Sequence, residues 1–291
     1  MSNQSSVKKL RSLQRTLQPV IKLDDQAWSY NVSGLPNSAE LSRQGLVKSI
    51  SVVSNDERQC ITLKLEQVPQ NRVTSVEPLD HFILISFADF RIRCPSKTNP
   101  NVTEAGSARQ SADYIIRLLQ TGININRVHY YFYGHSNSQL KSRSCFLLAE
   151  SVEEISRKVE LMGDFSKIKT VAKKAKRIGL LFSSAVMGVP LPPERCEDIP
   201  DVQSADYIFT DGCGLIAPQL AKQLVKQVNI TYRNKKYMPS VFQIRYRGYK
   251  GILTYEPSMH GKILAKFRDS MRKFKGAVDH DLYVVEYSKV T

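Results

Sequence analysis

Two glycine-containing blocks in the second half of the chain constrain its fold more than any other feature. Residues 209–214 read as a strand that runs into a glycine turn, and residues 239–251 alternate strand-forming residues with cations before a Gly-x-Lys-Gly sequence. Glycine lets the backbone take positive φ or approach another group closely, so Lys250 between Gly248 and Gly251 can be held at the end of a pair of strands. A lysine held in this way suits phosphate oxygens.

Both blocks are expected to form tight turns. Asp211, Gly212 and Gly214 are assigned to the turn between the first strand and the helix after it, and Gly248 and Gly251 to the turn around the lysine. Neither block contains Gly-x-x-x-x-Gly-Lys-Ser/Thr, and no serine lies in a Gly-x-Ser-x-Gly elbow. The sequence therefore argues against a nucleotide hydrolase and against a serine hydrolase.

The composition is typical of a globular protein. The 291 residues are 42% hydrophobic and 24% charged, and no uninterrupted apolar run reaches the roughly 18 to 20 residues that a membrane span needs. Residues 1–9 carry charge without an apolar segment behind them, so no secretory signal is expected. The five cysteines are scattered, without a Cys-x-x-Cys pair or zinc-ligand spacing, which indicates free thiols in a reducing compartment. We expect an intracellular protein, cytoplasmic or nuclear, without a zinc site.

Positive charge is concentrated towards the C-terminus. Residues 221–291 hold fifteen cations and five carboxylates, so they contribute +10 of the formal net charge of +15. Such a field attracts a polyanion, and cations that neutralise phosphates give an affinity that falls with salt. A basic surface that only aids solubility is the simpler alternative. Aromatic residues that lie among these cations could stack on bases, although aromatic residues in strands more often belong to the core.

Hydrophobic periodicity and turn residues predict a mixed, α+β, fold. Strands are expected at residues 46–53, 60–65, 81–87, 128–133 and 144–148, and helices at residues 7–17, 108–120, 151–162, 165–177 and 218–227. From about Ser204 onwards the pattern becomes mostly antiparallel β. The expected regions are a poorly structured segment (1–45), a mixed strand and helix region (46–186), a proline-rich linker (187–203) and a β region (204–291).

Four further segments, together with the two blocks, carry a resemblance to a known family. They are residues 133–145, 174–184, 267–274 and 282–288, and their order and spacing are more specific than any one motif. From about His81 to its end, the chain resembles the catalytic core of the cell-encoded eukaryotic RNA-dependent RNA polymerases that act in RNA silencing.

The resemblance implies a polymerase core of two double-psi β-barrels that face each other across an RNA channel. The family's metal-binding Asp-x-Asp-Gly-Asp loop lies on the second barrel, whereas residues 204–291 resemble an incomplete first barrel. In-line nucleotidyl transfer is typically served by two metal ions. We therefore expect Mg²⁺ in the complete enzyme, but not bound by this chain alone.

Three pairs of aspartates were candidates for a substitute metal site, and none has the family's pattern. The pairs are Asp279 with Asp281, Asp206 with Asp211, and Asp198 with Asp201. The first has Asp-x-Asp spacing without the Gly-Asp continuation and is expected to cap a turn and a strand. The second flanks a strand, and the third lies in the proline-rich segment, where charges are normally solvated. No catalytic or metal-binding residue is assigned.

The resemblance places Lys250 on the family's glycine-flanked lysine and Lys273 on a second basic position of the same barrel. Both are implied to contact RNA or nucleotide phosphates. Arg245 precedes Lys250 at an odd separation, so the two side chains point to opposite faces if their strand is unbroken, and a break at Gly248 is the alternative. Arg245 is accordingly either a third phosphate-binding residue or a surface charge.

The resemblance implies a segment of an RNA-directed RNA polymerase, a nucleotidyltransferase that makes complementary RNA and supports siRNA production. The chain would supply the phosphate-binding wall of the site. Its expected partners are an RNA template, nucleoside triphosphates and other silencing proteins, with no membrane. The alternative is a non-catalytic, basic RNA-binding module, because function resides in the site rather than in the fold.

Overall fold

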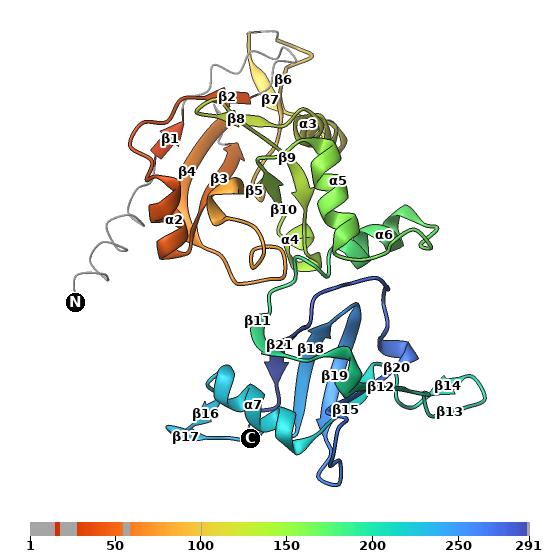
Figure 1. Ribbon diagram of the computed structural model, residues 1–291. Helices are drawn as coiled ribbons and strands as arrows, with labels where there is room; N and C mark the ends of the chain where they lie inside the picture. The colour runs from red at the N-terminus through yellow and green to blue at the C-terminus, as the bar shows by residue number, and fades with distance from the viewer. Residues whose placement is uncertain (1–14, 18–27, 55–58, 100, 290–291) are drawn as a thin grey trace. The chain divides into compact units, whose positions relative to one another are not determined.

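The computed structural model describes residues 15–17, 28–54, 59–99 and 101–289. The chain divides into two compact units (Figure 1): unit 1 comprises Met1–Val68 and Val73–Ser156, and unit 2 comprises Pro69–Arg72 and Arg157–Thr291. Both units combine helices with β-sheets, which confirms the expected mixture of α and β structure. Across the described ranges, no helix is both long and apolar enough to span a membrane.

Unit 1 is built on an eight-stranded sheet with the strand order β1-β4-β3-β5-β10-β9-β8-β2. Its strands are β1 (Arg15–Leu17), β2 (Trp28–Tyr30), β3 (Leu46–Ser54), β4 (Gln59–Gln67), β5 (Phe82–Ser86), β8 (Ile123–Ile125), β9 (Val128–Gly134) and β10 (Ser144–Leu148). Other elements are α2 (Ser38–Gln44), α3 (Ala108–Thr121), α4 (Asn137–Lys141) and the two-stranded pair β6 (Arg93–Pro95) and β7 (Thr103–Ala105). Helix α5 (Val152–Leu161) follows β10.

In unit 1, apolar strand residues that the sequence predicted form the core. Alternate residues of a strand point to one face of a sheet, and Ile50 of β3 and Ile61 of β4 are fully buried. Helix α3 begins at a capping box between Ser107 and Gln110 and ends at Gly122, as its sequence predicts. The segment expected to be poorly structured contains β1, β2 and α2. Of the helix expected at residues 7–17, residues 7–14 lie outside the described residues, and the rest forms β1.

Unit 2 is built on a seven-stranded sheet with the order β11-β21-β18-β19-β15-β20-β12. Its strands are β11 (Val186–Pro190), β12 (Cys196–Ile199), β15 (Cys213–Ile216), β18 (Val241–Tyr246), β19 (Tyr249–Tyr255), β20 (Ala265–Arg268) and β21 (Asp281–Tyr287). Two small hairpins, β13 (Gln203–Ser204) with β14 (Tyr207–Ile208) and β16 (Thr231–Tyr232) with β17 (Lys235–Lys236), stand beside it. The helices are α6 (Val171–Ile178) and α7 (Pro218–Gln227), with a 3-10 turn η3 (Asp269–Met271) after β20.

Helix α7 and the sheet of unit 2 share one hydrophobic core. Leu220 and Leu224 of α7 are fully buried in the same cluster as Phe242, Ile244 and Leu253 of β18 and β19. Burial of one such side chain stabilises a fold by about 1.5 to 3 kcal/mol. This core holds the β18–β19 pair firmly and leaves its turn at the edge of the unit. The end of β18 and the start of β19 are therefore fixed in position.

The segment expected to be a linker contributes two strands to this sheet. β11 pairs with β21, and β12 pairs in parallel with β20. Both lie at the edges of the sheet, where proline is tolerated because its missing N–H removes no ladder hydrogen bond. The β structure of unit 2 therefore begins at Val186 rather than at Ser204.

The helix expected at residues 165–177 is shorter than its sequence indicated. α6 begins at Val171. The Asp164 carboxylate accepts hydrogen bonds from the N–H and hydroxyl of Ser166, at 2.9 and 2.5 Å. A side chain that satisfies the backbone locally favours a turn over a helix. Residues 165–170 therefore lie outside the helix, and the basic residues of α6 are confined to two turns.

Candidate functional site

The hairpin formed by β18 and β19 places Arg245 and Lys250 side by side. The two residues are direct cross-strand partners, and Tyr246 pairs with Tyr249 next to the turn. The turn residues Arg247 and Gly248 both have positive φ, 41° and 86°, which is typical of a two-residue type I′ hairpin. The strand is therefore broken at Gly248. Arg245 and Lys250 do not lie on one continuous strand, so their side chains do not point to opposite faces. Partners across a ladder point to the same face.

Lys273 reaches the same hairpin from the segment after η3. Its N–H donates to the Gly248 carbonyl at 2.8 Å, and Arg272 forms a single β-bridge with Tyr249. A Cβ on Gly248 would lie 2.2 Å from the Phe274 carbonyl oxygen, so only glycine allows this approach. The Lys273 ammonium donates to the Ser270 carbonyl. The two lysines singled out in the sequence are thus brought together by one turn.

Neighbouring cations act on each other in this cluster. Burial lowers the pKa of the Lys250 ammonium, and three charges lower it further: Arg245, Lys273 and Arg177. Burial and Arg177 also lower the pKa of Lys273, against the opposing effect of Asp211 and Asp201. The like charges that lower the pKa of these two lysines would be offset by a bound anion. We call Arg177, Arg245, Lys250 and Lys273 the cation cluster.

Arg177 was not singled out from the sequence. It lies in the last turn of α6, next to Lys176, and its charge is felt by both lysines. The basic end of a helix that leads into the barrel-like region is the signal that could have pointed to it. Nothing in the sequence indicates which of the basic residues of α6 faces the hairpin.

Arg245 is buried, with 8% of its surface exposed. Its Nη1 donates to the Ile244 carbonyl at 2.8 Å, whereas Nε has no hydrogen-bond partner. Burial lowers the pKa of its guanidinium to about 10. Neither Arg245 nor Lys250 forms an ion pair with a carboxylate of the described residues. Such a pair of cations can accept a phosphate or carboxylate group.

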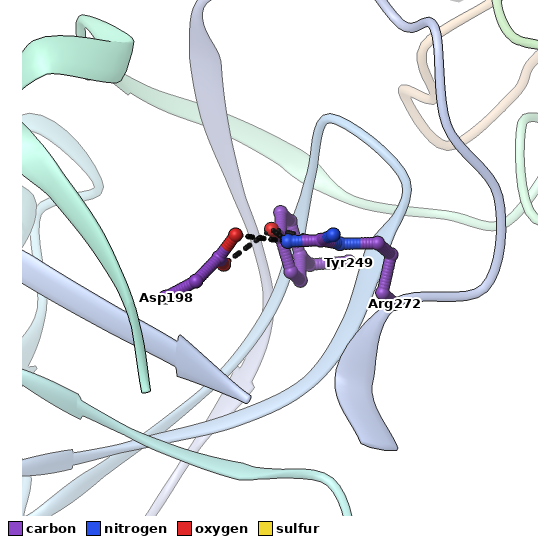
Figure 2. Close-up of polar contacts among 3 residues, drawn as sticks. All are labelled: Asp198, Tyr249 and Arg272. Atoms are coloured by element: carbon purple, nitrogen blue, oxygen red, sulfur yellow. Dashed lines mark hydrogen bonds and ion pairs between the residues drawn. The ribbon is translucent and has the colours of Figure 1, made fainter. Parts of the chain in front are cut away.

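Asp198, Tyr249 and Arg272 form a closed polar network beside the cluster (Figure 2). The Tyr249 hydroxyl donates to Asp198 Oδ1 at 2.5 Å and accepts from Arg272 Nε at 3.0 Å, while Arg272 Nη2 forms an ion pair with Asp198. Burial, followed by the hydrogen bond to Asp198, raises the pKa of Tyr249 to about 12. The expectation that Asp198 is simply solvated is wrong, because β12 brings it to β19.

Asp201 joins the first glycine-containing block to η3. Its carboxylate accepts from the Ser270 N–H at 2.9 Å, from the Ser270 hydroxyl at 2.7 Å and from the Thr210 hydroxyl at 3.0 Å. Burial opposes ionisation of Asp201, but these hydrogen bonds outweigh it and hold its pKa below the usual value. The expectation of a solvated linker charge is wrong here too. Asp201 fixes the segment that carries Lys273.

The residues expected to form turns are divided between turns and strands. Asp211 and Gly212 lie in the turn before β15, and Gly248 lies in the hairpin turn. Gly214 and Gly251 lie within β15 and β19 instead. A Cβ on Gly251 would lie 2.2 Å from the Gly212 carbonyl oxygen, so glycine is required there for close approach of two backbones rather than for a turn.

The described residues contain no group of three or more His, Cys, Asp or Glu side chains that could hold a metal ion. Asp279 pairs with Arg72 at 2.5 Å, and burial raises its pKa. Asp206 is exposed in the turn of the β13–β14 hairpin. The candidate site is therefore a cluster of cations, and the carboxylates of Asp198 and Asp201 beside it are engaged in hydrogen bonds and an ion pair.

Comparison with known proteins finds relatives among RNA-dependent RNA polymerases. Residues 59–291 match the family described as RNA dependent RNA polymerase. The chain is 32% identical over 221 residues to probable RNA-dependent RNA polymerase 1 of Oryza sativa subsp. japonica, a match that covers 72% of this chain and 28% of that protein. It is 31% identical over 217 residues to RNA-dependent RNA polymerase 1 of Arabidopsis thaliana, covering 72% of this chain and 19% of that protein.

A solved structure supports the same likeness at the level of the fold. The RNA dependent RNA polymerase QDE-1 from Thielavia terrestris matches with a TM-score of 0.61 and 17% sequence identity, over 84% of this chain and 28% of that one. The chain thus spans less than a third of the length of each of these three proteins.

Proposed function

The chain belongs to the RNA-dependent RNA polymerase family, and on this premise we propose that it is part of an enzyme that copies an RNA template into complementary RNA. The substrates would be the template and nucleoside triphosphates. The proposed setting is RNA silencing inside the cell, in the cytoplasm or nucleus, with siRNA production and other silencing proteins as partners.

The observation that carries the proposal is the cation cluster at the β18–β19 turn. The segments that carry Lys250 and Lys273 meet there through the Lys273–Gly248 backbone hydrogen bond and the Tyr249–Arg272 bridge, and Arg245 lies directly opposite Lys250. Lys and Arg without carboxylate partners attract phosphates. We propose that Lys250, Lys273 and Arg245 hold RNA or nucleotide phosphates, and that the sheet of unit 2 corresponds to the first double-psi β-barrel of the polymerase core.

Magnesium is proposed for the complete polymerase only. The described side chains do not fit a magnesium site, because none of their carboxylates, histidines or cysteines gather in threes. No role in metal binding is therefore proposed for these residues. Their part is to bind and orient phosphates opposite carboxylates that another portion of the polymerase would supply.

The test is the salt dependence of RNA binding. Each phosphate neutralised on a single strand contributes about −0.7 to the slope of log K against log salt. Lys250→Ala and Lys273→Ala should each weaken binding of a single-stranded RNA and make the slope shallower by about 0.7. Lys226→Ala, at an exposed position on α7, is the matched control and should leave the slope unchanged. Equal slopes in all variants would remove the two lysines from the site.

A non-catalytic RNA-binding module is the second candidate. It is favoured by the lack of a metal-binding group among the described residues. Template copying by the 291-residue chain with magnesium and nucleotides would contradict the module. Salt-dependent RNA binding without synthesis would support the module for this chain.

A further inference from the structure

The β13–β14 hairpin exposes an aromatic pair. Tyr207 is 65% exposed and Phe209 64%, and their ring centroids lie 4.9 Å apart at an interplanar angle of 74°. In Figure 1 the hairpin projects from the side of unit 2, away from the seven-stranded sheet. Val202 adds a further exposed apolar side chain at its base. Large apolar groups gathered at an exposed position mark a binding surface.

The base of this hairpin is bonded to the segment that carries Lys273. The Phe209 N–H donates to the Val202 carbonyl at 2.9 Å, and the Val202 N–H donates to the Thr210 hydroxyl at 2.9 Å. Thr210 in turn donates to Asp201, which accepts two hydrogen bonds from Ser270. The Ser270 carbonyl accepts from the Lys273 ammonium. The aromatic pair and the cation cluster are thus joined by a short, continuous chain of bonds.

We propose that Tyr207 and Phe209 stack on a base of a single-stranded RNA whose phosphates lie on the cation cluster. The inference rests on the proposed function and adds a second, uncharged contact to it. Residues 202–209 contain no Lys or Arg and one carboxylate, Asp206, so the hairpin disfavours phosphate. The π-face of a base is the part of RNA that suits an exposed aromatic ring next to a basic surface.

The experiment compares two RNA oligomers of the same length, one with bases throughout and one with abasic positions. Stacking of a base on an aromatic side chain contributes about 5- to 150-fold in affinity. The double variant Tyr207→Ala/Phe209→Ala of the 291-residue chain should lose this factor on the normal oligomer and little on the abasic one. Its salt slope should stay unchanged, because no phosphate contact is removed.

Two further variants sharpen the result. Tyr207→Phe keeps the ring and should bind like the unaltered chain. Tyr232→Ala removes a 40% exposed aromatic residue from the other small hairpin of unit 2 and should also have little effect. An equal loss on both oligomers, or a loss with Tyr232→Ala as large as with the double variant, would overturn stacking at this hairpin.

The outcomes separate this inference from the proposed function. Salt-dependent RNA binding that is identical with and without the aromatic pair would overturn the inference alone. No salt-dependent binding of RNA by the unaltered chain would overturn the proposed function, and the stacking role with it. Thermal unfolding of each variant should match that of the unaltered chain, because both rings are mostly exposed.

Discussion

Arg245 is a buried cation that no carboxylate of the described residues balances. Burial lowers its pKa, its Nε lacks a hydrogen-bond partner, and the like charge of Lys250 lies directly across the ladder. A buried charge without a partner destabilises a fold. An anion that binds only the native protein would offset that cost through its binding free energy. The proposed contact with phosphate would therefore explain why Arg245 is kept at this position.

Arg245→Met should separate the stability of the fold from its binding of phosphate. Methionine has a similar length and no charge, so we expect the free energy of unfolding to stay the same or to rise by about 1 kcal/mol. RNA affinity should fall, and the salt slope should become shallower by about 0.7. The one tryptophan, Trp28, lies in unit 1, so its fluorescence does not report on unit 2. The stability of unit 2 is therefore best measured by hydrogen exchange of the β18 and β19 amides.

Arg268→Met is the matched control, because the Arg268 guanidinium donates to the Cys213 carbonyl at 2.9 Å and to the Pro200 carbonyl. It should destabilise unit 2 by about 1 kcal/mol or more. A loss of stability in Arg245→Met as large as in Arg268→Met would mean that Arg245 supports the fold rather than a ligand.

The residues of the site were predictable to different degrees. Lys250 and Lys273 stand in motifs, so the resemblance alone made them candidates for the site. Arg177 and Asp201 depend on contacts with residues far along the chain, such as the bond from Ser270 to Asp201, which joins positions 69 residues apart. A local pattern carries no information about such a partner, and for this reason Asp201 looked like a solvated charge in a linker.

At the scale of elements, β12, β19 and the segment after η3 are tied together by Asp198, Tyr249 and Arg272. The Tyr249 ring also stacks on Phe267 of β20, with centroids 4.5 Å apart, and the Arg272 guanidinium lies 5.0 Å from the Tyr249 ring centroid. The Tyr249 hydroxyl therefore forms the polar contacts of this residue, and its ring forms the stacking contacts. Removing it alone tests the polar network without disturbing the stack.

Tyr249→Phe should destabilise unit 2 by about 1 kcal/mol, because it removes hydrogen bonds to a carboxylate and a guanidinium. The expected loss of stability is small because Asp198 is 53% exposed and water screens the charges. Tyr255→Phe, on the same strand, is the control and should change stability by less than about 0.5 kcal/mol. Hydrogen exchange of the β19 amides gives both values, and equal effects of the two substitutions would contradict a structural role for the network.

Elements with their own capping and periodicity were predictable from sequence. The helices at 108–120 and 218–227 were found within a residue of α3 and α7, because their apolar positions and terminal residues agree. Strands β11 and β12 were missed because β11 ends at Pro190 and β12 is flanked by Pro193 and Pro200. Proline normally ends regular structure, and sequence alone does not reveal that these strands lie at sheet edges, where proline is tolerated.

At the scale of the whole molecule, residues 69–72 belong with unit 2 although the strands before and after them belong to unit 1. The Gln70 carbonyl accepts from the Ala185 N–H at 2.8 Å, and Arg72 is buried, with 8% of its surface exposed. The amino-acid composition does not change at residues 69–72, so the sequence does not show that they belong with unit 2. The separation of the chain into units is therefore set by long-range contacts rather than by the proline-rich segment.

The ion pair between Arg72 and Asp279 should stabilise unit 2 in a way that a double-mutant cycle can measure. Arg72→Met leaves a mostly buried carboxylate unpaired, and Asp279→Leu leaves a buried guanidinium unpaired. We expect each to destabilise unit 2 by about 2 to 4 kcal/mol. The double variant should be less destabilised than either single one, because neither charge is then buried alone. Hydrogen exchange of the α7 amides reports on this unit, and additive effects of the two substitutions would show that residues 69–72 do not anchor it through this pair.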